Sequence, residues 1–180
     1  RSPGPTPHAS RPLPLTRAAL RPVVARVKAV SALLERPLIL ENASTYAEFA
    51  ASSMPEGEFF GRLMEAADCG MLLDVNNVYV SAFNHGFDPK AYLDAIEPSR
   101  VTQYHLAGHT NKGTHIVDTH NDHVIDPVWD LYRHAVSRTG NVSTLLDWDA
   151  DIPAFEFVQA DALQSRALRA PETPRVAADS

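Results

Sequence analysis

The sequence predicts an α/β fold built on a parallel sheet, with the spacing of a (β/α)8 TIM-barrel-type domain. Apolar runs of strand length begin near residues 38, 71, 102 and 144, and segments with helical periodicity lie between them. This alternation is typical of parallel sheets. The first two intervals, 33 and 31 residues, match the roughly 31 residues per unit of an eightfold barrel. Only four strands are predicted, half of a barrel, and on pattern alone a doubly wound sheet also fits.

The domain is expected to span residues 15–168, between two segments without core character. Residues 1–14 contain five of the fourteen prolines and predict an irregular, extended arm, and residues 169–180 predict a solvated tail. Apolar residues at three- and four-residue spacing predict a helix from Thr16 to Leu34, although Pro22 favours a later start. The apolar run at 38–42 predicts the first strand.

The rest of the chain continues the alternation. Thr45 and Glu48 form a capping-box pattern, which predicts a helix that breaks at Met54-Pro55 and continues to Ala67. The run at 71–77 predicts the second strand, followed by a loop. Further elements are predicted as a helix at 89–96, a strand at 101–105, a polar loop at 107–125, a helix from 126, a strand at 143–147 and a helix at 152–168.

Composition excludes several classes of function. The formal net charge of −6 argues against a surface that binds nucleic acid through bulk charge. No apolar stretch approaches the roughly 18–20 residues of a membrane span, and no secretion signal is evident, so a cytoplasmic protein without membrane contact is expected. Cys69 is the only cysteine, which excludes an internal disulfide and any metal site that needs several thiolates. Any metal must therefore be bound by nitrogen and oxygen ligands.

A group able to bind a metal ends each predicted strand. These groups are Glu41, Asp74, His105 and Asp147. Because the carboxyl ends of parallel strands share one edge of the sheet, the four are expected to converge at one rim. Carboxylates with imidazole suit iron, manganese or zinc. The alternative is that each residue only forms a turn or caps the helix that follows it, which a single residue of this kind does more often than not.

The loop at 107–125 adds further ligands, since five of the eight histidines lie between residues 105 and 123. Asp118 and His120 are two residues apart, so in an extended loop their side chains point to opposite sides. They reach one ion only if the backbone turns there, and otherwise they bind two neighbouring ions. His109, His115 and His123 are expected to be solvated, or to orient a ligand, rather than to bind metal directly.

At these residues the chain resembles the multinuclear non-haem iron-dependent oxidative enzymes, the family of the methanobactin biosynthesis oxidase. The resemblance runs from about residue 12 to residue 165. The segments that carry it are Leu13-Pro14-Leu15-Thr16, LILENAS, GMLLDVNNVYVSAFNHGFDP, QYHLAGH, VDTH, DPVWDLY and TLLDWDADIP. The segment LLDVNNVYVSAFNHG is the most specific of these.

The resemblance implies a fold, a chemistry and a set of partners. It implies a (β/α)8 barrel that holds two or three iron ions and uses O2 to oxidise a cysteine of a ribosomally synthesised precursor peptide. A companion protein that recognises the peptide leader is common in such systems. Carried over by position, the ligands are Glu41, Asp74, His105, Asp118, His120 and Asp147, with Asn42, Asn77 and His109 as supporting groups or further ligands. No residue is assigned a catalytic role.

Two departures from the family pattern matter. Family members show Glu where this chain has Asp147, whose side chain is one methylene shorter. They also have four further strands, with two histidine ligands, before the segment at Leu13, so the chain is expected to be an N-terminally truncated member that keeps the C-terminal half-barrel. Such a half leaves strand edges and one sheet face uncovered. A second copy, a separate N-terminal half or the Pro-rich arm is expected to cover them.

Two other functions remain open from the residues. A redox-silent divalent-metal isomerase or hydrolase of the sugar-isomerase barrel type uses the same ligand types, with the metal as a Lewis acid. An inactive half-barrel that only binds a peptide or a partner is the third reading, because the truncation removes two of the family's histidine ligands.

Overall fold

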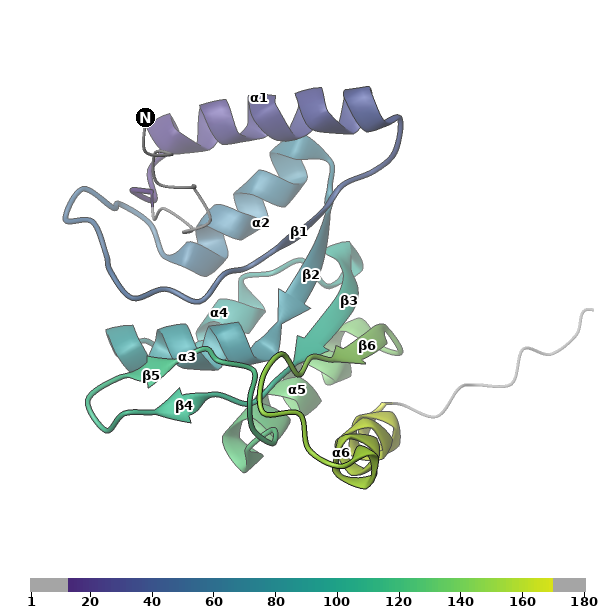
Figure 1. The fold of residues 1–180 in the computed structure, drawn as a ribbon. Coiled ribbons are helices and arrows are strands. Elements are labelled where there is room, and N and C mark those ends of the chain that lie inside the picture. The colour runs from purple at the N-terminus through teal and green to yellow at the C-terminus, as the bar shows by residue number, and fades with distance from the viewer. Residues whose placement is uncertain (1–12, 170–180) are drawn as a thin grey trace, which may run out of the picture.

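The computed structural model describes residues 13–169 of the chain (Figure 1). Residues 1–12, which make up most of the predicted arm, and residues 170–180, which make up most of the predicted tail, lie outside the described residues. Among the described residues, none of the helices combines the length and the apolar character that a bilayer crossing requires.

Four parallel strands form the main sheet. They are β1 (Ile39–Glu41), β2 (Gly70–Asp74), β3 (Val101–Leu106) and β6 (Ser143–Leu146). Their order in the sheet is β1-β2-β3-β6, and each neighbouring pair runs parallel. The predicted parallel α/β architecture is therefore confirmed. The strand order follows the chain, whereas a doubly wound sheet reverses its order at a switch point.

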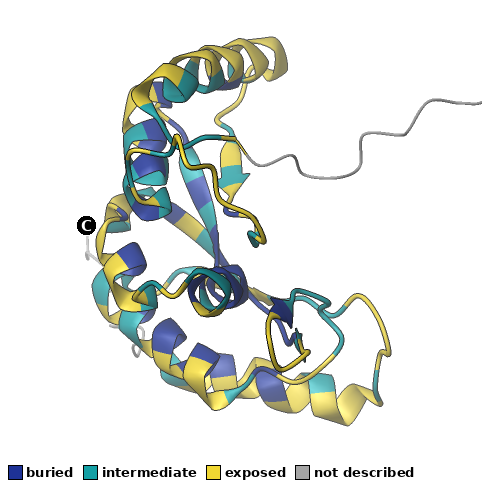
Figure 2. Cartoon of the chain, turned by 90° about the vertical axis from the view of Figure 1, so that its left-hand side faces the viewer, coloured by how far each residue is buried: buried dark blue, intermediate teal, exposed yellow. Residues whose placement is uncertain are grey.

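Helices cover one face of this sheet. The helices are α1 (Arg17–Leu34), α2 (Glu56–Ala67), α3 (Val75–His85), α4 (Pro89–Asp94), α5 (Asp126–Thr139) and α6 (Phe155–Leu168), with a 3₁₀ turn at Pro98–Arg100. They form an arc along one side of the strands (Figure 2).

Alternation along the strands separates the two faces. Leu73 of β2 and Tyr104 and Leu106 of β3 are buried in the same core cluster as residues of α2, α4 and α5. Burying a side chain of this size contributes about 1.5–3 kcal/mol. On the opposite face, Ile39 of β1 is 50% exposed and Leu145 of β6 is 45% exposed. Within the described residues, the face opposite the helices is therefore exposed at its two edge strands, β1 and β6.

The first helix begins where its cap dictates. Thr16 is the N-cap, and its hydroxyl accepts a hydrogen bond from the Ala19 backbone N–H at 3.0 Å. Pro22 lies inside α1 and does not move its start. Because proline lacks an N–H, it removes one hydrogen bond of this helix.

The helix predicted from Thr45 is wrong. No helix is present between Asn42 and Pro55, and α2 begins only at Glu56. The Thr45 hydroxyl does not cap a helix, because it lies 3.2 Å from the Ser81 hydroxyl and 3.0 Å from His85 Nε2. The Thr45 hydroxyl, which the capping-box pattern predicts to cap a local helix, therefore contacts two side chains of α3 instead.

Helix α3 was not predicted. The strand ends at Asp74 and the helix starts at the next residue, Val75, with no loop between them. Asp74 is itself the N-cap, since its Oδ1 accepts from the Asn77 backbone N–H at 2.7 Å.

The loop at 107–125 also holds a short hairpin, β4 (Thr110–Asn111) with β5 (Ile116–Val117). The last helix begins at Phe155 rather than at Ile152.

Candidate metal centre

The strand register brings the predicted strand-end residues to one rim. Asp74 of β2 is aligned with His105 of β3, and Asp147 follows directly after β6. Glu41 is aligned with Leu72, two residues before Asp74, so it lies one step further from the rim on the same face.

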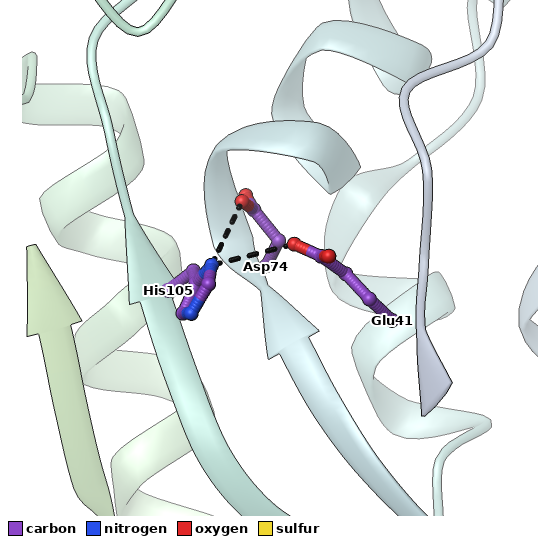
Figure 3. A group of neighbouring side chains, drawn as sticks. All are labelled: Glu41, Asp74 and His105. Carbon is purple, nitrogen blue, oxygen red and sulfur yellow. Dashed lines mark ion pairs between the residues drawn. The ribbon is translucent and has the colours of Figure 1, made fainter. Parts of the chain in front are cut away.

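The first group of candidate ligand atoms lies around Nδ1 of His105. His105 Nδ1 lies 3.3 Å from Glu41 Oε1, 4.0 Å from Asp74 Oδ2 and 3.8 Å from Asp147 Oδ2. Figure 3 shows His105, Asp74 and Glu41 pointing toward one another from three neighbouring strands. Two atoms that bind one transition ion with bonds of about 2.1 Å are at most about 4.2 Å apart. All three distances to His105 fall within that limit.

Two atoms of this group lack hydrogen-bond partners among the described residues. His105 Nδ1 and Asp74 Oδ2 are buried and make no hydrogen bond. A buried polar atom without a partner costs about 1–3 kcal/mol, more if it is charged. A bound cation would satisfy both atoms at once, so the residues present fit a metal ion.

Asp74 is the most deeply buried member, with a side chain that is 0% exposed. Its backbone is held by Asn42, which accepts from the Asp74 N–H and donates to the Asp74 carbonyl, each at 2.9 Å. Asn77 in turn donates to the Asn42 carbonyl at 2.9 Å. Burial raises the pKa of Asp74 to about 8, with the Asp118 and Glu41 carboxylates adding to the shift. The Asp74 carboxyl thus caps α3 through one oxygen and faces the cluster with the other.

The second group surrounds the ring of His120. His120 Nε2 lies 2.8 Å from Asp118 Oδ1, and His120 Nδ1 lies 3.2 Å from Asp147 Oδ2 and 3.7 Å from Asp149 Oδ2. His120 has φ of 47°, the left-handed region. The backbone therefore turns at this residue, which brings Asp118 and His120 together despite their two-residue spacing.

Charge in this second group is strongly unbalanced without a cation. The Asp118 carboxylate beside the ring raises the pKa of His120 to about 9, against the effect of burial, and Asp74 and Asp147 add to the rise. His120 is therefore protonated at neutral pH when no metal is bound. A divalent ion among these carboxylates would take the place of that proton.

Asp147 belongs to both groups, because its Oδ2 faces His105 Nδ1 and His120 Nδ1. Backbone hydrogen bonds hold it there. The Asp147 N–H donates to the Leu106 carbonyl at 2.9 Å, and the Asp149 N–H donates to the His120 carbonyl at 2.8 Å. The end of β6 and the loop at residue 120 are thus tied into one structure.

Gly108 allows that loop to pass close to the end of β3. A Cβ atom at Gly108 would lie 2.0 Å from the backbone oxygen of Asp122. Any side chain at this position would push the chain at Asp122 away, and with it the neighbouring His120.

The remaining predicted histidines lie outside the two groups. His109 is 9% exposed and bonds Asn76 through Nδ1 at 2.7 Å. His123 pairs with Asp161 of α6 at 3.0 Å. His115 is exposed and lies 3.0 Å from the Thr114 hydroxyl.

Sequence reasoning missed three members of the site. Asn76 donates to Asp118 Oδ1 at 2.7 Å, and Ser44 donates to Asp118 Oδ2 at 3.2 Å. Asp149 Oδ2 lies 3.7 Å from His120 Nδ1. Asp149 has a sequence signal, since it is the second carboxylate of Asp147-Trp148-Asp149. Asn76 stands beside Asn77 with nothing to distinguish it.

Comparison with known proteins identifies the family. The model of the RiPP precursor modification enzymes MbnB/TglH/ChrH matches residues 6–170. The chain belongs to this family. This is the family that the sequence was found to resemble, so the predicted family membership is confirmed.

Individual relatives carry the name UPF0276 protein. One from Anaeromyxobacter sp. is 56% identical over 142 residues, which are 79% of this chain and 50% of that protein. One from Paraburkholderia phytofirmans is 43% identical over 166 residues, 89% of this chain and 54% of that protein. One from Acaryochloris marina is 45% identical over 154 residues, which are 86% of this chain and 56% of that protein. The chain thus spans about half the length of the curated relatives it matches.

Proposed function

We propose that this chain supplies metal-binding residues of an iron-dependent oxidase that modifies a cysteine of a ribosomally synthesised precursor peptide with O2. The family supports a precursor peptide as substrate. The two adjacent groups of nitrogen and oxygen ligands that share Asp147 support a centre with more than one metal ion. Manganese and zinc accept the same ligand types, so the choice of iron follows from the resemblance.

The residues divide the work between two neighbouring ions in this proposal. Glu41, Asp74 and His105 would hold one ion, and His120 with Asp118 and Asp149 would hold the other, while the Asp147 carboxylate contacts both groups. Asp147 could therefore contribute a carboxylate oxygen to either ion. Asn42 and Asn77 help to fix the position of Asp74.

Bound iron supplies one-electron chemistry and O2 activation, which no side chain of the chain provides. The protein's own part is to hold the carboxylates and the imidazole rings close together despite the repulsion between the carboxylates. The peptide's cysteine loses electrons in the reaction, and O2 accepts them. A leader-binding companion protein is proposed as a partner on the resemblance alone.

We further propose that the four-stranded sheet is one half of a closed barrel. The sequential strand order, the open face carrying Ile39 and Leu145, and relatives about twice as long support this. The other half corresponds to the part of the relatives that this sequence does not cover.

The test is metal analysis and O2 consumption with protein purified without air. We expect bound iron and, with a cysteine-containing precursor peptide, O2 uptake that a serine-for-cysteine peptide does not support. The protein is assayed alone and with the part of the Anaeromyxobacter relative that it does not cover. His105→Ala should lose iron, while His115→Ala, an exposed histidine in the same half of the chain, should keep it.

Three outcomes would contradict the proposal. Protein that binds no transition metal would exclude a metal oxidase. Turnover by the zinc form without O2 would favour the redox-silent isomerase or hydrolase. Metal binding without any reaction, alone or with the added half, would favour a chain that only binds a peptide or partner.

A further inference from the structure

A buried hydrogen-bond chain connects His109 to the second ligand group through Asn76. Asn76 is 0% exposed and lies in the first turn of α3. Its Nδ2 lies 2.7 Å from Asp118 Oδ1, and its Oδ1 lies 2.7 Å from His109 Nδ1. No other described side chain contacts both Asp118 and His109 by hydrogen bonds.

The chemistry of these groups determines the direction of each hydrogen bond. A carboxylate only accepts, so the amide NH2 of Asn76 faces Asp118. The amide oxygen of Asn76 therefore faces His109, and because that oxygen also only accepts, His109 Nδ1 must carry the hydrogen. In a neutral ring the other nitrogen, Nε2, is then the acceptor.

Two further contacts hold this arrangement. The ring of Tyr79 stacks on the ring of His109, with centroids 5.3 Å apart and an angle of 27° between the planes. The Ser44 hydroxyl donates to the second oxygen of Asp118 at 3.2 Å. Burial lowers the pKa of His109, which favours the neutral ring.

We propose that Asn76 is a positioning residue that holds Asp118 in its ligand orientation and keeps His109 in the Nδ1–H tautomer, with Nε2 as the acceptor. The hydrogen on Nδ1 follows from the hydrogen bonds and the acceptor at Nε2 from the burial of the ring, whereas the effect on metal affinity rests on the proposed function. Partners of this kind typically change metal affinity by about 10–100-fold when removed.

The first measurement is the tautomer of His109, read from the ring 15N chemical shifts of the full chain without metal at neutral pH. We expect the Nδ1–H form in the native protein. Asn76→Ala should shift the ring toward the Nε2–H form. Asn76→Asp keeps an acceptor for His109 but loses the donor to Asp118, so it should retain the Nδ1–H form.

The second measurement is the affinity for Mn(II), a probe that needs no exclusion of air. Asn76→Ala and Asn76→Asp should both weaken it by about 10–100-fold. The matched control is Asn84→Ala, which removes another asparagine of α3. The Asn84 side chain donates to the Ile116 carbonyl and accepts from the Ile116 N–H, and it makes no hydrogen bond with Asp118 or His109. This control should lower the unfolding temperature while leaving the tautomer and the affinity unchanged.

The readouts separate the two proposals. An Nε2–H ring in the native protein, or an unchanged tautomer in a folded Asn76→Ala protein, would overturn the role of Asn76. If Asn84→Ala weakens the affinity for Mn(II) as much as Asn76→Ala does, Asn76 would contribute only to the general stability of the fold. Native protein that binds no metal but shows the expected tautomers would contradict the proposed function alone.

Discussion

Asp147 Oδ2 lies 3.2 Å from His120 Nδ1. The same oxygen lies 3.8 Å from His105 Nδ1, so one carboxylate faces the rings of both ligand groups. His105 comes from β3 and His120 from the following loop, and Asp147 follows β6. The two groups are therefore one connected site, and changes at Asp147 should affect both.

Removing the charge of Asp147 should weaken metal binding in both groups. Asp147→Asn keeps the size of the side chain but loses the anion, so we expect the metal content after loading to fall and the affinity to drop by at least about tenfold. Asp147→Glu keeps the anion and lengthens the side chain by one methylene, so it should keep most of the native metal content. Asp130→Asn, which alters an exposed aspartate of α5, is the control. Native metal content in Asp147→Asn would exclude a direct role.

Metal affinity should rise with pH between about 6 and 9. The pKa of Asp74 is raised to about 8 and that of His120 to about 9. At pH 7 both groups hold a proton in the folded protein without metal, and the metal needs the deprotonated forms, so binding releases protons. Affinity should increase by up to about tenfold per pH unit for each proton released and level off above pH 9. Calorimetric titration in buffers of different ionisation enthalpy measures the proton count. A flat pH profile would argue against these ligands.

Glu56 should make the protein less stable as the pH rises from about 4.5 to about 7. Burial raises the pKa of Glu56 from 4.5 to about 7, although its hydrogen bond with Tyr92 lowers it. A raised pKa means that the folded state holds the proton more tightly, so stability is greatest below the unfolded pKa and is lost as the pH passes the folded pKa.

Glu56→Gln removes the group that loses its proton. The free energy of unfolding, measured with urea, should be higher for the variant than for the native protein by up to about 3 kcal/mol at pH 8.5. At pH 5 the two free energies should be close. An equal difference at both pH values would show that ionisation of Glu56 is not the cause.

A side chain at Gly108 should disrupt the loop that carries His120. The Cβ of Gly108→Ala would lie 2.0 Å from the Asp122 oxygen. Overpacking of this kind costs about 1–3 kcal/mol, and displacement of the loop should also reduce metal content. At Gly113 a Cβ meets no atom within 4 Å, although φ is 85° there. Gly113→Ala should therefore cost some stability from backbone strain but leave metal binding intact. The comparison fails if both variants lose metal equally.

Some of the fold was predictable because local patterns agreed with the tertiary structure. The apolar runs at residues 38, 71, 101 and 143 became strands, since each packs apolar side chains against the core on the helix-covered face, fully buried in β2 and β3 and partly buried in β1 and β6. The prediction failed where a group had two possible partners. The Thr45 hydroxyl bonds Ser81 and His85 instead of a local helix terminus. Helix α3 was missed because Asp74 ends the strand and caps the helix with no intervening turn residues.

The site was predictable in a similar way. Glu41, Asp74, His105 and Asp147 follow from strand ends alone, because parallel strands bring their carboxyl ends to one edge. Asn76 and Asp149 could not be predicted in this way, because their contacts depend on where the loop at 107–125 places Asp118 and His120.

The sequence by itself determined the parallel alternation, the family and the strand-end residues that meet at one rim, because each depends on residues that are close in the chain or repeat at a regular interval. Only the tertiary structure decided that one oxygen of Asp74 caps α3 while the other faces the cluster, that Asp147 faces two histidine rings, and that Asn76 joins Asp118 to His109. The Asp74 cap joins residues three apart, but the contacts of Asp147 with His120 and of Asn76 with His109 and Asp118 join segments that are 27 to 42 residues apart, to which no local pattern is sensitive.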